Sequence, residues 1–334
     1  MSKTPSLRRR SWRMAVLAVA AAASLFSAVA CGSGSAATTK RLYAYPRNPL
    51  FAAATQLKAQ GQGAEAADLH TIAATPSGIW ASGQPGEMQT VRQVTQAAAK
   101  ARAVPVIVAY NLPDRDSCGH LSASSGPTAP GYEQWIGQLA SAIGGGDDIV
   151  IVEPDGLPDI VRGCLNPAQS AERYQLLRYA MKRLGALPHA RVYLDAGNPG
   201  MFQDPSKLAG PLHQAGVKYG RGFSANVSNF QWTGVVVRWS QQLERALGGK
   251  AGAVIDTSRN GRGPYTGPDT PQWCNPPGRA VGPAPRLVPG PAGIDAYLWI
   301  KDPGASDGPC NGGPPAGQYW PQYAASLEQA SHST

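Results

Sequence analysis

The sequence predicts an α/β fold, a distorted TIM-like (β/α) barrel of about seven parallel strands. From Leu42 onward, short apolar runs of strand length alternate with longer segments of helical length. Alternating strand and helix signals favour a parallel sheet. No break in composition divides residues 41–334, which indicates a single domain there. Several apolar runs end in acidic residues, and the carboxyl ends of parallel strands are where α/β folds build their functional sites.

The strands are predicted where short apolar runs are bounded by turn-forming residues. They cover residues 70–75, 104–110, 149–153, 191–195, 222–227, 253–257 and 296–300. The third run shows the reasoning, because its Ile and Val residues alone fit a strand or a buried helix. Pro154 and Gly156 follow at once and end the run as a strand ends.

Helices are predicted in the intervals between these strands. They cover residues 50–60, 87–102, 132–143, 167–184, 206–215 and 234–247, with a last helix at 321–329. Residues 258–293 differ, since they are rich in Gly and Pro and have no clear periodicity. A long irregular segment inside a compact domain is usually functional or disordered, and a disulfide from Cys274 would favour order.

The first 30 residues are predicted to be a signal peptide and not part of the fold. A basic stretch precedes an apolar run at 14–30 that is too short and alanine-rich for a good membrane span. The run ends at Cys31, where the small residues fit either ordinary signal cleavage or a bacterial lipobox. The Gly- and Ser-rich residues 31–40 resemble a flexible tether and favour lipidation of Cys31. We therefore expect a secreted or cell-surface protein.

The basic charge belongs largely to the signal peptide. The formal net charge of +9 falls to +4 without residues 1–30, which hold five basic and no acidic side chains. The rest of the chain has no Lys/Arg cluster interleaved with aromatic residues, so nucleic acid is not an expected partner. No cofactor is implied by any motif.

Four cysteines remain after Cys31, namely Cys118, Cys164, Cys274 and Cys310. An even number in an exported chain indicates two disulfides, and the spacings match no zinc site. Three pairings are possible. We expect Cys118–Cys164 and Cys274–Cys310, because each would join loops that follow two strands bearing acids.

Two acidic clusters follow the second and third predicted strands. In the first, Asp114 and Asp116 flank Arg115, which indicates either a salt-bridged loop or a functional carboxylate held by the arginine. In the second, Glu153 and Asp155 end the strand. A helix N-cap is one interpretation. The other is a buried acid whose pKa is raised by neighbouring carboxylates, so that it donates a proton at neutral pH.

Two further clusters follow later strands. Asp195 ends the run at 191–195 and is either a capping residue or a third carboxylate of the site. Asp302 and Asp307 are either turn residues or site residues, and Lys301 is either a substrate hydrogen-bond donor or a surface lysine.

Three tryptophans lie on the loop side of the predicted barrel. Any one of Trp80, Trp232 and Trp273 can be a core residue. Their position beside the carboxylates instead indicates a stacking platform for sugar rings.

Six segments together resemble glycoside hydrolase family 6, the secreted cellulases of bacteria and fungi. They are YNLPDRD (110–116), IVEPDGL (151–157), YLDAG (193–197), FSANVSN (223–229), IDTSRNG (255–261) and WCNPPGR (273–279). The motifs occur in the family's order over about residues 41–325. The resemblance implies a distorted parallel barrel and inverting hydrolysis of β-1,4-glucan.

The resemblance also implies a role for each matching acid. Asp155 matches the general acid, and Asp116 the aspartate that supports it and helps to activate water. Asp195 matches a structural and electrostatic partner, and Asp307 the carboxylate often proposed as the base. Tyr110 matches the residue that enforces ring distortion. Lys301, Trp80 and Trp273 match substrate contacts, and the cysteine pairs match the family's two disulfides. We also expect Asn226, Asn229, Trp232 and Ser122 to contact the substrate.

Three departures from the family pattern are present. Asn198 and Met201 replace a His and a Trp, Ala305 replaces a Glu, and an extra residue leaves both Ser122 and Ser124 as candidates for the water-binding serine. The first two replacements affect the leaving-group side of the expected site.

We predict an endo-β-1,4-glucanase, because the segment between Lys301 and Trp320 is short and tunnel-forming relatives have longer loops there. Two alternatives stay open. One is hydrolysis of another cell-surface β-glucan. The other is a catalytically weak or inactive glycan-binding lipoprotein of the same fold.

Overall fold

The computed structural model of the protein describes residues 40–267, 271–288 and 293–332. They belong to the second of two compact units, which spans residues 39–334. The predicted signal peptide and Cys31 lie outside the described residues. Within those residues, no helix combines the length and apolarity that a membrane crossing requires.

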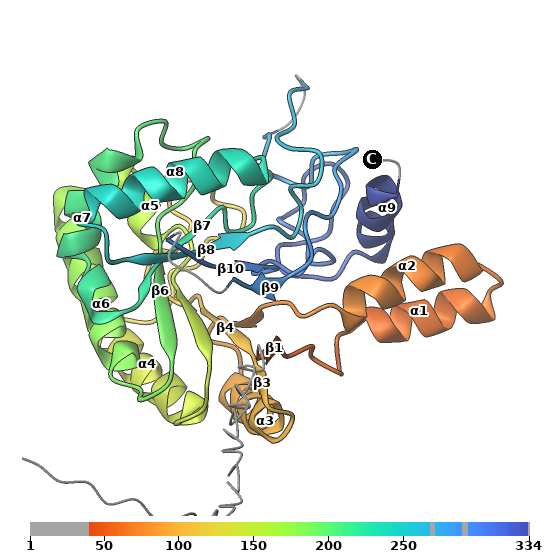
Figure 1. Cartoon of the computed structure of the whole chain (residues 1–334), viewed down its shortest axis with the longest axis horizontal. Helices are drawn as coiled ribbons and strands as arrows, with labels where there is room; N and C mark the ends of the chain where they lie inside the picture. The colour runs from red at the N-terminus through yellow and green to blue at the C-terminus, as the bar shows by residue number, and fades with distance from the viewer. Residues whose placement is uncertain (1–39, 268–270, 289–292, 333–334) are drawn as a thin grey trace, which may run out of the picture. The chain divides into compact units, whose positions relative to one another are not determined.

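A curled and mostly parallel sheet forms the centre of the described unit (Figure 1). Its parallel strands, in spatial order, are β2 (Ile79–Ala81), β4 (Val106–Ala109), β5 (Ile149–Val152), β6 (Arg191–Asp195), β7 (Gly222–Ala225), β8 (Gly252–Asp256) and β10 (Ile294–Leu298). The antiparallel β9 (Arg286–Leu287) follows β10 at the edge, and β1 (Arg41–Leu42) pairs separately with β3 (Ala103–Val104). The prediction of a distorted parallel barrel is confirmed.

The two ends of the curled sheet meet through a short backbone contact. Ser77 and Trp299 form an isolated parallel bridge, and the N–H of Gly78 donates to the Trp299 carbonyl at 2.8 Å. A Cβ on Gly78 would lie 2.3 Å from the Ile300 carbonyl oxygen, so only glycine permits this approach. The contact brings β2 beside the end of β10.

Helices cover the outer face of the sheet on one side and form a separate cluster on the other. The outer helices are α3 (Glu87–Lys100), α4 (Ala129–Ile143), α5 (Gly156–Val161), α6 (Pro167–Gly185), α7 (Ala209–Gln214) and α8 (Thr233–Ala246), with 3₁₀ turns at Pro205–Leu208 and Val217–Tyr219. The helices α1 (Leu50–Ala59), α2 (Gly63–Ala74) and α9 (Pro321–Ser331) pack together through Leu50, Leu69, Ile72 and Leu327 (Figure 1).

The strand β5 explains why the central strands are almost continuously apolar. Ile149 and Ile151 belong to the cluster inside the barrel, whereas Val150 and Val152 pack against the outer helices. All four side chains are 0 % exposed. A strand buried on both faces has no position for a polar residue until it ends, and so its acids stand at its carboxyl end.

One predicted strand was wrong. Residues 70–75 form the last part of helix α2 and its C-cap. The spacing of Ala66, Leu69 and Ala73, all buried, places them on one helical face, which outweighs the β-branched Thr71 and Ile72. The strand β2, which the sequence did not predict, takes the first place in the sheet instead. The sheet therefore has the expected seven parallel strands, but one of them is not the predicted one.

Candidate active site

A cleft of about 870 Å³ opens at the carboxyl ends of the parallel strands. Most of the predicted site residues line it, namely Tyr110, Asp116, Ser122, Asp155, Asp307, Trp80, Asn229, Trp273 and Lys301. Asp195, Asn226 and Trp232 are not part of its wall. The sequence-based choice of residues therefore converges on one surface.

Asp155 follows β5 at the first turn of α5. Its backbone φ is +65°, and its side chain makes no capping hydrogen bond to the helix, which removes the N-cap interpretation. Burial raises the pKa of its carboxyl well above the usual value, and the nearby charges of Asp195, Asp159 and Asp116 raise it further. The raised pKa favours the protonated form of this carboxyl, which lines the cleft.

Asp195 lies directly behind Asp155. Its carboxylate accepts the N–H of Asp155 at 3.0 Å, the N–H of Gly197 at 3.3 Å and the hydroxyl of Ser224 at 3.1 Å. Burial raises the pKa of Asp195 to about 7. It holds the backbone of Asp155 in its left-handed conformation, and its charge contributes to the raised pKa of Asp155.

A second group of polar side chains surrounds Asp116. Its carboxylate accepts the backbone N–H of Ser122 at 2.7 Å and the Ser122 hydroxyl at 2.9 Å. The phenol of Tyr110 lies 2.9 Å from the same hydroxyl, and the Tyr110 ring meets Trp80 edge to face. Ser124 instead accepts the N–H of Gly126 and does not line the cleft. Of the two candidate serines, Ser122 thus lies beside the acid.

The prediction that Arg115 holds one of its neighbouring aspartates was wrong. Its guanidinium donates to the carbonyl oxygens of Ser82, Tyr110 and Ser122 at 2.7–3.1 Å, and it lies over the Tyr110 ring. Backbone carbonyls at a turn can satisfy guanidinium donors as well as a carboxylate does. Arg115 therefore shapes the loop that carries Asp116 and leaves the acid free of an ion pair with it.

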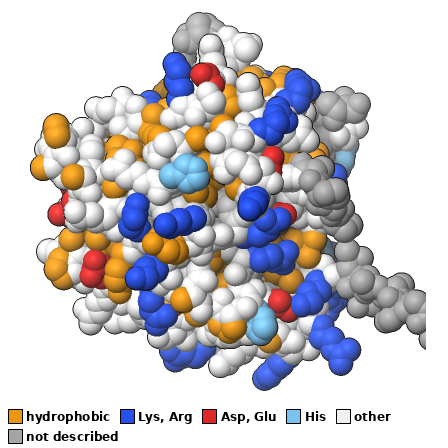
Figure 2. Space-filling model, turned by 60° about the vertical axis from the view of Figure 1, so that its left-hand side comes forward, with side chains coloured by type: hydrophobic (Ala, Val, Ile, Leu, Met, Phe, Trp, Pro, Cys, Tyr) orange, Lys and Arg blue, Asp and Glu red, His pale blue; other side chains and the backbone are white. Residues whose placement is uncertain are grey.

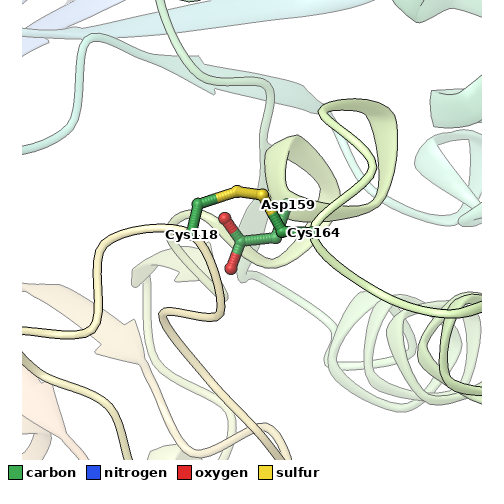
Figure 3. Close-up of side chains that lie close together, drawn as sticks. All are labelled: Cys118, Asp159 and Cys164. Carbon is green, nitrogen blue, oxygen red and sulfur yellow. A yellow bond between two sulfur atoms is a disulfide. The ribbon is translucent and has the colours of Figure 1, made fainter.

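The predicted disulfides are both present, and the first one braces this loop. Cys118 and Cys164 are joined next to the carboxylate of Asp159 (Figure 3). Asp159 accepts the N–H of Ser117 at 2.7 Å and lies 3.6 Å from Arg173. The grouping is not a metal site, because sulfurs bonded to each other offer no thiolate ligand. It ties the Asp116 loop to helix α5, which begins after Asp155.

Asp307 lines the same cleft and occupies a cationic environment. Its two oxygens accept from Arg259 at 2.7 and 2.9 Å, and Lys301 lies 3.2 Å away. Burial alone would raise the pKa of Asp307, but the charges of Arg259 and Lys301 outweigh it and hold that pKa below its ordinary value. The lowered pKa favours the ionised form of Asp307 and makes it a weak proton acceptor.

The second disulfide, Cys274–Cys310, holds the irregular segment against Asp307. Asn275 donates its backbone N–H to the Asp307 carboxylate at 3.0 Å, and its side-chain oxygen accepts the N–H of Asp307 at 2.9 Å. Trp273, two residues before Asn275, lines the cleft. The described part of this irregular segment is thus ordered around the site.

Besides Asp195, three candidate residues lie away from the cleft wall. Asn226 is 0 % exposed and donates to the Asp256 carbonyl at 2.9 Å, so it supports the loop after β7. Trp232 is 51 % exposed and lies outside the cleft. Glu153 is buried and accepts from the N–H groups of Asn111 and Leu112 and from the hydroxyl of Tyr132, which makes it a structural acid.

The three residues that replace family residues face the cleft. Asn198, Met201 and Ala305 line it. The side-chain oxygen of Asn198 accepts the N–H groups of Gly200 and Met201 at 2.9 and 3.2 Å. This fixes the amide group in a turn at one end of the cleft.

Sequence reasoning missed Arg259, which is 0 % exposed and holds Asp307. A usable signal was present, since an arginine three residues after the end of a buried strand needs a counter-ion. Arg162 also lines the cleft, at the end of the short helix α5 that the sequence did not predict.

Comparison with known proteins gives a consistent result. The family model described as "Glycosyl hydrolases family 6" matches residues 37–331. Endoglucanase 1 of Streptomyces sp. (strain KSM-9) is 40% identical over 261 residues, 77% of this chain and 70% of the relative. Endoglucanase 1 of Streptomyces halstedii is 38% identical over 272 residues, 79% of this chain and 81% of the relative.

A solved structure agrees with these relatives. The endoglucanase Cel6 from Mycobacterium tuberculosis, in complex with methyl-cellobiosyl-4-deoxy-4-thio-β-D-cellobioside, superposes with a TM-score of 0.80 at 39% identity. The match covers 88% of this chain and 98% of that one.

Proposed function

This chain belongs to glycosyl hydrolase family 6, and we propose that Asp155 is the acid with which it cleaves β-1,4-glucan chains. The endoglucanase relatives support a cellulose-cleaving glycoside hydrolase. The observation that carries the assignment is the position of the Asp155 carboxyl in the cleft, where burial and the neighbouring Asp195, Asp159 and Asp116 raise its pKa.

The proposed reaction is a single displacement with inversion. Asp155 gives its proton to the glycosidic oxygen as the bond from that oxygen to the anomeric carbon breaks. A water molecule attacks the anomeric carbon from the opposite face and forms the new C–O bond. The proton that this water loses leaves through the polar group on the Asp116 side of the cleft, and Asp155 regains a proton from solvent.

Ser122 and Asp116 are the groups that we assign to holding the attacking water. Both line the cleft and are hydrogen-bonded to each other, and Tyr110 contacts the same hydroxyl. Burial raises the pKa of Tyr110 above its ordinary value, so its phenol stays neutral beside the sugar. Its ring is fixed between Trp80 and Arg115, which suits a residue that constrains the ring of the substrate.

Asp307 has a different proposed role. A carboxylate whose pKa is lowered by two cations has little affinity for a proton, which argues against its service as the general base. A fixed negative charge on the cleft wall can instead stabilise the positive charge that develops on the sugar. Lys301 and Trp273 are proposed to contact the substrate directly.

Wild-type protein incubated with carboxymethyl cellulose and barley glucan tests this function. We expect new reducing ends, and a fall in the viscosity of carboxymethyl cellulose that precedes most of the sugar release, as internal cleavage requires. Release of sugar from another β-glucan only would establish a different substrate. Release from none of them would contradict the proposed hydrolysis.

Export is a separate proposal, since residues 1–30 have the features of a signal peptide. Mass spectrometry of the mature N-terminus tests it. A diacylglyceryl adduct on Cys31 would support the membrane tether, and an unmodified N-terminus near that position would support simple secretion.

A further inference from the structure

Trp232 lies just outside the cleft and has no role in the mechanism above. Its side chain is 51 % exposed. Among the described residues, the only other large apolar side chain with comparable exposure is Val235, one turn later, at 37 %. The neighbours of Trp232 in the chain connect it to the cleft, because Gln231 lines the wall directly before it. An exposed aromatic ring at the edge of a binding cleft calls for an explanation.

The backbone of Trp232 is fixed. It occupies the N-cap position of helix α8, where its carbonyl accepts the N–H groups of Val235 and Val236 at 2.9 and 3.0 Å. The N–H of Gln231 donates to the side-chain oxygen of Asn226 at 3.3 Å. The indole ring therefore projects from a rigid helix start.

The segment around Gly263 packs against the indole ring of Trp232. A Cβ placed on Gly263 would lie 2.1–2.6 Å from three atoms of the indole, so the glycine backbone packs directly against the ring. Arg279 holds this segment by donating to the carbonyl oxygens of Arg262, Gly263 and Pro264, each at 3.1 Å. Pro264 also lines the cleft. The ring is thus positioned against the loop on one side and open to solvent elsewhere.

We propose that Trp232 is an outlying sugar-binding platform that holds a glucosyl unit of a chain longer than the cleft accommodates. The π face of an indole carries negative charge that attracts the apolar C–H face of a pyranose ring. Within the described residues no acceptor takes the indole N–H, which leaves it available to a sugar hydroxyl. The platform continues the cleft at the end that contains Gln231, Gly200 and Asn198. This inference rests on the proposed function, since it names the length of glucan that the site prefers.

The test compares cellotetraose with cellohexaose as substrates for wild type and Trp232→Ala. Loss of a stacking contact of this kind should raise KM for cellohexaose by about three- to tenfold. KM for cellotetraose and kcat for both substrates should stay unchanged. Trp232→Tyr should restore most of the affinity for cellohexaose, and Val235→Ala should behave as wild type with both.

Each outcome separates the platform from the proposed function. A wild type that hydrolyses both substrates, with Trp232→Ala unchanged on both or weakened equally on both, would overturn the platform alone. A wild type inactive on both would overturn the proposed function. Unfolding curves that match those of wild type exclude a folding defect in the variant.

Discussion

Replacing Asp307 with Asn removes the charge that faces Arg259 and Lys301 but keeps the shape of the side chain. Arg259 is 0 % exposed, and its contacts to Asp307 are 2.7 and 2.9 Å long, so water cannot replace the lost carboxylate. Removing one partner of a buried ion pair costs about 3–5 kcal/mol. We expect Asp307→Asn to lower the free energy of unfolding at pH 7 by about that amount.

The dependence on pH has a definite sign. The pKa of Asp307 in the folded protein lies below its ordinary value of 3.8. Its stabilisation is therefore present above that value and is lost as the pH falls through the lowered pKa. The difference in stability between wild type and Asp307→Asn should be full at pH 7 and should shrink below about pH 4.

Urea unfolding followed by tryptophan fluorescence, without reductant, measures this difference. Asp147→Asn is the control, because Asp147 pairs with Lys40 at the surface and an exposed pair contributes at most about 1 kcal/mol. In the double variant Asp307→Asn, Lys301→Met the cost should be smaller than the sum of the single costs, since one unpaired cation is removed. An Asp307→Asn variant as stable as Asp147→Asn would contradict the expected cost of leaving Arg259 buried without a counter-ion.

Two other variants test particular contacts. Ser122→Ala should lower kcat by about 10²-fold with little change in KM, because the Ser122 hydroxyl joins Asp116 to Tyr110. Ser124→Ala should have the kcat of wild type. Equal losses of kcat in both variants would contradict the role of Ser122 in holding water. Asp148 has two buried carboxylate oxygens without a partner among the described residues, and burial together with Asp147 raises its pKa to about 7. The free energy of unfolding of wild type should therefore fall as the pH rises from about 4 to 7. Asp148→Asn should be more stable than wild type by about 2–4 kcal/mol at pH 8 but not at pH 4. An equal difference at both pH values would contradict the raised pKa of Asp148.

The carboxyl ends of the strands could be predicted from the sequence, because a strand buried on both faces is a continuous apolar run that ends at the first polar or turn-forming residues. The strand that precedes Asp155 and the strand that ends at Asp195 were therefore placed correctly, and the two acids lie together. The disulfide pairs followed from the same reasoning, since each joins two of these loops.

Contacts between segments remote in sequence could not be predicted in the same way. The partner of Arg259 lies 48 residues away, and Arg115 prefers carbonyl oxygens over the acids beside it. The left-handed backbone at Asp116 and Asp155, with φ of +55° and +65°, depends on the loops around it. The end of helix α2 was mistaken for a strand because Thr71 and Ile72 are β-branched, although the buried Ala66, Leu69 and Ala73 have helical spacing.

The proton donated by Asp155 is tested most directly by comparing wild type with Asp155→Ala on two substrates. Hydrolysis of carboxymethyl cellulose needs protonation of a poor leaving group, whereas 2,4-dinitrophenyl β-cellobioside releases a phenolate that needs none. If Asp155 is the proton donor, Asp155→Ala should lower the rate on carboxymethyl cellulose by about 10²–10⁴-fold and the rate on the dinitrophenyl substrate far less. The fall in rate at alkaline pH should also disappear in the variant. Equal rates for the two proteins on carboxymethyl cellulose, or equal losses on both substrates, would contradict this role of Asp155.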